Sequence, residues 1–432
     1  MSKTLVLALT ASLVLAGCGK DAAEQQADVA GSQQPWAEFA ATVIDDYYAR
    51  NPETAVDAGL HQYDGQMSDL SMAAVDEYAA WLDAVLAEAA TYADLEGIEA
   101  FERDYLSTAL QGELFWIRES GFLTSNPLAY AGAIGISVYV DREYAPLDQR
   151  LLAYTQYMEQ VPAMLEQMKK NLKPPLPAPY VEMGHRVFSG LVEYLSTTVP
   201  GIFLPVADEQ LQRRFKAAND AAVEAIQQSV EWLDRLKASA TDEFALGEET
   251  FLKMLSATQG VDISLEELTA AGQRNLDANL DMLFEACAEF APGESTEACV
   301  AKVSGNKPEG GAVAGARAQL PMLKEFVVDN NIASIPGTED ALVDEAPPHR
   351  RFNFAYINIP GPFETGLPST YYIAPPDPEW SEEDQLAYVP GEADLLAVSV
   401  HEVWPGHFLQ FLHSNRTENN VGQHFGTYTF SE

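Results

Sequence analysis

The chain has 432 residues, room for one large domain or two or three smaller ones, and 47% of them are hydrophobic. Its 65 acidic residues outnumber 25 basic ones, which gives a formal net charge of −40. Because phosphate contacts require a basic surface, we expect no nucleic-acid partner. The charge predicts a solvated, self-repelling surface, and adaptation to a salt-rich environment is the more specific alternative.

The N-terminus has the pattern of an export signal. A short basic start precedes an apolar run that ends at Cys18 and is too short for a comfortable membrane span. The ending Leu-Ala-Gly-Cys resembles a bacterial lipobox, in which cleavage leaves a lipid-bearing cysteine as the first residue. We predict a lipoprotein signal peptide over residues 1–17 and a flexible tether over 18–35, with a plain cleaved signal as the alternative. Gly19, in place of the aspartate that retains lipoproteins in the inner membrane, favours an outer-membrane anchor facing the periplasm.

We expect residues 36–432 to form a mainly α-helical, multi-helix domain. Apolar residues recur at helical spacing in six long segments, 36–50, 73–95, 99–120, 147–172, 208–240 and 264–290. The last of these begins with Ser264 and has a glutamate three residues later, the pattern of a capping box.

Three segments interrupt this helical pattern. Residues 120–146 contain Asn-Pro, several glycines and the sequence ISVYV, which predicts a loop with a short strand. Residues 304–316 form a turn-rich connector. Residues 346–391 are rich in proline and aromatics, and the alternation in FNFAYINI and STYYIA predicts two extended segments that form a hairpin. A helical pattern resumes over 392–404.

Two cysteines, Cys287 and Cys299, lie within the predicted exported part of the chain. An oxidising compartment favours a disulfide between them. Metal binding by the pair is the less favoured alternative because no histidine lies near them in the sequence.

The sequence HEVWPGHFLQ, residues 401–410, contains the candidate metal ligands and the candidate catalytic base. His401 and His407 are candidate zinc ligands, and three protein ligands would leave a fourth position for water. Zinc lowers the pKa of bound water to about 7, and a neighbouring carboxylate can take up its proton. Glu402 fits this role of general base.

The spacing of the two histidines differs from H-E-x-x-H, in which they are four residues apart. On a regular helix, six residues would place His407 roughly 120° around the axis from His401. Pro405 removes a helical hydrogen bond and clashes with the carbonyl of residue 401, and Gly406 is conformationally permissive. We therefore predict that the helix breaks between Trp404 and Gly406, so that His407 can turn back towards His401.

HEVWPGHFLQ resembles the H-E-x-x-P-G-H-x-x-Q signature of the bacterial domain-of-unknown-function family 885. Residues 51–71, 126–130 and 360–375 also resemble recurring patterns of that family. The resemblance implies a mostly helical, exported or lipid-anchored protein similar to gluzincin-type metallopeptidases. In the family, a later F-x-E-G-W-A-L-Y motif supplies a glutamate as third zinc ligand, and Glu432 in TYTFSE matches it. We therefore expect a helical C-terminal portion to be missing here.

Other residues of the shared segments have candidate roles. Gln410 is expected to support a zinc ligand, and the hydroxyl of Tyr372, or of its neighbour Tyr371, could stabilise an oxyanion. Aromatic packing is the alternative for both tyrosines. The sequence thus predicts a zinc peptidase with one Zn²⁺ per chain. A non-catalytic binding lipoprotein, or a zinc hydrolase of a small non-peptide amide or ester, is the alternative.

Overall fold

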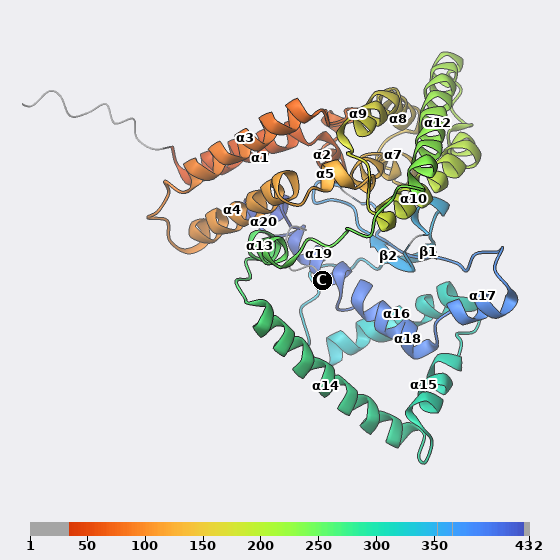
Figure 1. Ribbon diagram of the computed structural model, residues 1–432. Helices are drawn as coiled ribbons and strands as arrows, with labels where there is room; N and C mark the ends of the chain where they lie inside the picture. Colours follow the sequence, from red (N-terminus) through yellow and green to blue (C-terminus); the bar gives the residue numbers. More distant parts are fainter. Residues whose placement is uncertain (1–33, 352, 365, 427–432) are drawn as a thin grey trace, which may run out of the picture.

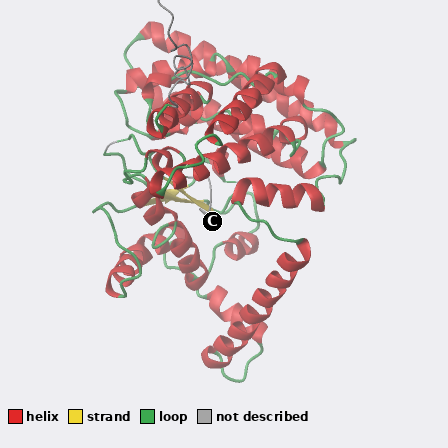
Figure 2. Cartoon of the chain, turned by 90° about the vertical axis from the view of Figure 1, so that its left-hand side faces the viewer, coloured by secondary structure: helices red, strands yellow, loops and turns green. Residues whose placement is uncertain are grey.

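The computed structural model describes residues 34–351, 353–364 and 366–426. Helices make up most of this part of the chain, with one small sheet, which confirms the predicted fold class. Figure 2 shows the sheet between a larger upper group of helices and a smaller lower group. No helix within the described residues is long and apolar enough to cross a membrane.

The N-terminal helices form the first of the main cores. They are α1 (Trp36–Arg50), α2 (Pro52–Asp57), η1 (His61–Tyr63), α3 (Met72–Ala89) and α4 (Gly97–Arg118), and the short helix α5 (Phe122–Ser125) follows in contact with α4. Val421 and Phe425, from the end of the described chain, are buried in the same core. The helix α20 (Asn420–His424) therefore packs against α1 and α4, and Tyr105 donates a hydrogen bond to the carbonyl of Phe425 at 2.7 Å.

The second core lies among the next group of helices. These are α6 (Leu128–Gly132), α7 (Ser137–Asp141), α8 (Leu147–Met158), α9 (Val161–Asn171), α10 (Ala178–Thr197), α11 (Val199–Phe203) and α12 (Glu209–Lys237). The predicted helix over 147–172 is divided into α8 and α9, with Pro162 in the first turn of α9. Proline is favoured there because that position needs no hydrogen-bond donor.

The strand predicted for ISVYV is wrong, because these residues enter α7. Val138, Tyr139 and Val140 are all buried, so the segment lacks the one-sided burial of a strand. A helical turn forms its hydrogen bonds internally, whereas a strand would require a neighbouring strand.

A buried hydrogen-bond chain joins three helices of the second core. The Tyr154 hydroxyl donates to Asn219 Oδ1 at 2.6 Å, and Asn219 Nδ2 donates to the carbonyl of Leu195 at 2.9 Å. We expect Tyr154→Phe to lower the free energy of unfolding by about 1–2 kcal/mol, because it leaves a buried amide oxygen without its donor. Urea denaturation measures this change, and an unaltered midpoint would contradict it.

The chain continues with α13 (Glu248–Gln259), which packs against α4, and then enters the lower group with α14 (Leu265–Phe290), α15 (Thr296–Gly305) and α16 (Gly311–Asp329). The predicted capping box of α14 is present between Ser264 and Glu267. The Sγ atoms of Cys287 and Cys299 are bonded at 2.01 Å, which ties α14 to α15. Figure 1 shows α14 extending away from the other helices, and α16 begins inside the predicted connector.

The sheet and the final helices enclose a third core. The strands are β1 (Leu342–Glu345), β2 (Ala355–Asn358) and β3 (Thr370–Ile373), with η2 (Pro348–Arg350) between the first two. Their order is β1–β3–β2; β2 pairs antiparallel with β3, as predicted, and β1 pairs parallel with β3. The helices α17 (Glu382–Tyr388), α18 (Glu392–Glu402) and α19 (His407–Ser414) follow, and this core includes Trp404 and Phe408.

Candidate metal centre and its cavity

The predicted break in the helix lies between α18 and α19. The helix α18 ends at Glu402, and α19 begins at His407. A Cβ atom on Gly406 would lie only 1.6 Å from the carbonyl oxygen of His401. Gly406 has a φ of −72°, so glycine is required here for the close approach and not for a left-handed conformation. The chain thus turns back directly over the last turn of α18.

The turn brings the two histidines of the motif together. The Nε2 atoms of His401 and His407 are 3.1 Å apart, and the ring planes are nearly perpendicular. Two nitrogen ligands of a tetrahedral zinc ion, each about 2.05 Å from the metal, are about 3.3 Å apart. The observed spacing therefore fits two ligands of one zinc ion.

Glu402, next to His401 in the sequence, and Trp404, in the turn between the two helices, are both buried. Glu402 is only 7% exposed, yet it lines the same cavity as both histidines. The Trp404 ring packs edge-on against Phe408, and Lys324 Nζ lies 5.1 Å from its centre. This packing anchors the turn in the third core, so the histidines are held by buried side chains.

Two predicted residues lie outside the described residues, namely Cys18 and the third zinc ligand Glu432. Within the described part, no group of three or more His, Cys, Asp or Glu side chains is arranged to hold a metal ion. The structure thus brings His401 and His407 together, and the role of all three residues as zinc ligands stays a prediction.

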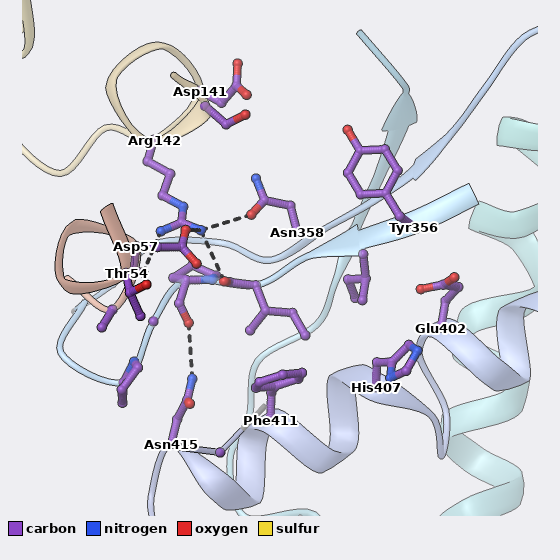
Figure 3. Close-up of a pocket in the computed structure, with 18 of the residues that line it drawn as sticks. Thr54, Asp57, Asp141, Arg142, Tyr356, Asn358, Glu402, His407, Phe411 and Asn415 are labelled. Carbon is purple, nitrogen blue, oxygen red and sulfur yellow. Dashed lines mark hydrogen bonds and ion pairs between the residues drawn. The ribbon is translucent and has the colours of Figure 1, made fainter. Parts of the chain in front are cut away.

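A cavity of about 720 Å³ opens at these residues. Figure 3 shows Glu402 and His407 towards one end of it, and Asp57, Asp141 and Arg142 towards the other. The strand β2 and the residues that follow it run between the two ends. In the sheet as described, β2 is an edge strand, and all four of its residues, 355–358, line the cavity.

The structure separates the candidate tyrosines. Tyr372 lines a second cavity, of about 840 Å³, together with Trp404. Tyr371 is fully buried in the third core, and its hydroxyl has no hydrogen-bond partner of good geometry within the described residues. Tyr356, which the sequence did not single out, stacks on Tyr372 and lines the cavity of the two histidines. Gln410 is half-buried on α19, and its supporting role stays a prediction.

Two further titratable groups line the cavity and were not predicted. Burial lowers the pKa of His424 to about 4, and its Nδ1 lies 2.9 Å from the Tyr48 hydroxyl. Loss of hydration raises the pKa of Asp141 to about 6, although Tyr194 and nearby arginines oppose the shift. Neither residue lies in a recognisable motif. Only the packing of their helices, α20 and α7, brings them to the cavity.

Comparisons with solved structures show the same fold in longer chains. A Shewanella oneidensis protein described as a "putative lipoprotein of unknown function" matches with a TM-score of 0.66 and 22% identity, over 91% of this chain and 74% of its own. A Colwellia psychrerythraea protein, also described as a "putative lipoprotein", has a TM-score of 0.69 and 13% identity, over 92% of this chain and 75% of its own. The search of curated proteins found no match. The family model described as "Bacterial protein of unknown function (DUF885)" matches residues 52–432, and the chain therefore belongs to this family.

Proposed function

We propose that this protein is a zinc-dependent hydrolase that cleaves peptide bonds. The observation that carries the proposal is the pair of Nε2 atoms of His401 and His407, 3.1 Å apart beside the buried Glu402. All three residues line one cavity of about 720 Å³, within the usual volume range for ligand sites.

His401 and His407 would hold the metal, with Glu432 as the proposed third ligand. A bound zinc ion supplies a Lewis acid that polarises a carbonyl and makes water a stronger nucleophile. Glu402 would accept the proton of the attacking water and pass it to the departing amine. Because Glu402 is buried, few water molecules compete for its carboxylate.

The free edge of β2 supports a peptide as substrate. An edge strand presents N–H and C=O groups that can pair with an extended chain, a common mode of peptide binding. Tyr356 projects from this strand, and burial raises its pKa, so its hydroxyl remains a donor at neutral pH. We propose Tyr356 as a donor to the developing oxyanion in place of the sequence candidate Tyr372, because Tyr356 lines the cavity of the two histidines and Tyr372 lines the other cavity.

We also propose that the protein is a lipoprotein of the cell envelope, anchored through Cys18. The lipobox pattern supports this location, as does the description of both solved structures as lipoproteins. An outer-membrane position facing the periplasm follows from Gly19 and is part of the proposal.

Zinc content tests the metal site. We expect about one zinc ion per chain after dialysis of the protein, and its loss in His401→Ala and in His407→Ala, measured by mass spectrometry of the metal. His413→Ala is the matched control, because His413 lies on the same helix α19 and contacts the carbonyl of Ser334 at 2.8 Å. A full-length protein that stays metal-free in added zinc would favour a binding lipoprotein instead.

A further inference from the structure

One wall of the cavity is a chain segment that follows β2. Residues 359–364, here called the strap, continue from β2 and line the cavity through Ile359, Pro360, Gly361 and Pro362. Asn415, the C-cap residue of α19, donates from Nδ2 to the carbonyl of Pro360 at 3.1 Å. The strap is thus tied to the helix that begins at His407.

The opposite side of the strap lies directly on the backbone of the N-terminal helices. A Cβ atom on Gly361 would lie 2.4 Å from backbone atoms of Ala58, and one on Gly59 would lie 2.7 Å from the backbone nitrogen of Glu364. Phe363 donates its N–H to the carbonyl of Ala58 at 3.0 Å. These contacts leave no space for side chains between the two segments.

Charged side chains fasten both ends of the strap. Arg142, which is 8% exposed, donates from Nη2 to Asn358 Oδ1 at 3.1 Å and to the carbonyl of Ile359 at 3.3 Å. The same guanidinium binds the side chain and the carbonyl of Asp57 at 2.9 and 3.0 Å. At the other end, the side chain of Glu364 is 5% exposed, and its Oε1 lies 3.2 Å from His61 Nε2 and 4.0 Å from Arg142 Nη1.

His61 is held by groups on three sides. Its Nδ1 lies 3.0 Å from Asp64 Oδ1, and its ring stacks on Tyr144 with centroids 3.7 Å apart. Tyr144 in turn donates its hydroxyl to Asp64 Oδ2 at 2.8 Å. Both ring nitrogens therefore face carboxylates, an arrangement that favours the protonated imidazole with two N–H donors.

We propose that His61 and Arg142, with Asp64 and Glu364, form a clamp that positions the strap and the cavity-facing edge of β2. These four are positioning residues, because they act through the strap and are separate from His401, Glu402 and His407. The assignment of a substrate to this edge rests on the proposed function, whereas the clamp itself does not.

The clamp has a defined pH dependence. Burial acts to lower the pKa of His61, but its hydrogen bonds to Asp64 and Glu364 outweigh this effect and raise the pKa to about 9. The groups that face it are Asp64, Glu364 and Tyr144, with Arg142 beyond Glu364. Because the folded pKa lies above the usual value of about 6.5, the stabilisation is complete below that pH and is lost as the pH rises through about 9.

Hydrogen exchange of the full chain tests the clamp. We expect the protection factors of residues 355–364, corrected for intrinsic exchange, to fall about tenfold between pH 7 and pH 10 in the native protein. His61→Phe keeps a ring against Tyr144 but has no donors, so protection should already be low at pH 7 and should not fall further. His185→Phe is the matched control, because His185 contacts Asp234 at 3.1 Å between α10 and α12, and it should behave like the native protein.

Equal protection of the strap in His61→Phe and the native protein, or protection that does not change with pH, would overturn the clamp. If His61→Phe does not fold, Glu364→Gln serves in its place, since it keeps the side-chain shape, removes one of the two carboxylates that face His61, and should reduce the fall in protection between pH 7 and pH 10. Zinc content should be unchanged in either variant, so failure of the clamp and failure of the metal site are distinguishable. Where hydrolysis is measurable, the clamp variants should raise KM more than they lower kcat.

Discussion

We expect Glu402→Gln to reduce hydrolysis by about 10²–10⁴-fold while the zinc content stays unchanged. Glutamine has nearly the shape of glutamate and fits the same buried site, but it cannot accept the proton of the attacking water. Glu402 is not assigned as a ligand, so the metal should remain bound to His401 and His407. Initial rates on a mixture of peptides, together with metal analysis of the same samples, measure both effects.

Glu392→Gln is the matched control for this change. Glu392 lies in the first turn of the same helix, α18, and accepts a hydrogen bond from Asn306 at 3.0 Å on the surface. It should keep full activity. Turnover retained in Glu402→Gln would show that another group is the base, and loss of zinc would instead make Glu402 part of the metal site.

Gly406→Ala should abolish zinc binding and lower the free energy of unfolding by about 3 kcal/mol. The added Cβ atom would lie 1.6 Å from the carbonyl oxygen of His401 and 2.5 Å from that of Val400, both of which are backbone atoms that cannot rotate away. The turn must therefore open, and His407 must move away from His401. Urea denaturation and zinc titration measure the two consequences.

Gly272→Ala provides the contrast. Gly272 lies inside α14, and a Cβ atom there would meet nothing within 4 Å. Alanine should stabilise that helix by up to about 1 kcal/mol, because it loses less backbone entropy than glycine. If Gly406→Ala bound zinc as tightly as the native protein, the backbone contact with His401 could not be what sets the histidine pair.

The features that could be predicted from the sequence depend on local interactions. The break between Trp404 and Gly406 was predicted because Pro405 excludes a helical hydrogen bond whatever surrounds it, and the helix ends two residues earlier, at Glu402. The capping box of α14 was equally predictable, since Ser264 and Glu267 are three residues apart on one turn. The extended segments in FNFAYINI and STYYIA were recognisable from their alternation.

Other features required knowledge of the packing. Alternation did not show that Tyr356 would line the cavity of the two histidines while Tyr372, on which it stacks, lines the second cavity, because that depends on the α16 and α18–α19 segments packed around the sheet. The segments 51–71 and 360–375 were noted separately, but nothing local indicated that Gly59 and Gly361 bring them into backbone contact.

By itself, the sequence determined the mainly α-helical fold class, the break in the helix, and the two imidazoles and one carboxylate of HEVWPGHFLQ. Each of these follows from residues within a few positions of one another. Only the tertiary structure decided that His401 and His407 meet at 3.1 Å, that Glu402 is buried at a cavity, and that a clamp around His61 holds the cavity wall. These features join residues up to about 300 positions apart, as His61 and Glu364 are. Their approach is set by the burial of apolar surface in the cores, which no short stretch of sequence contains.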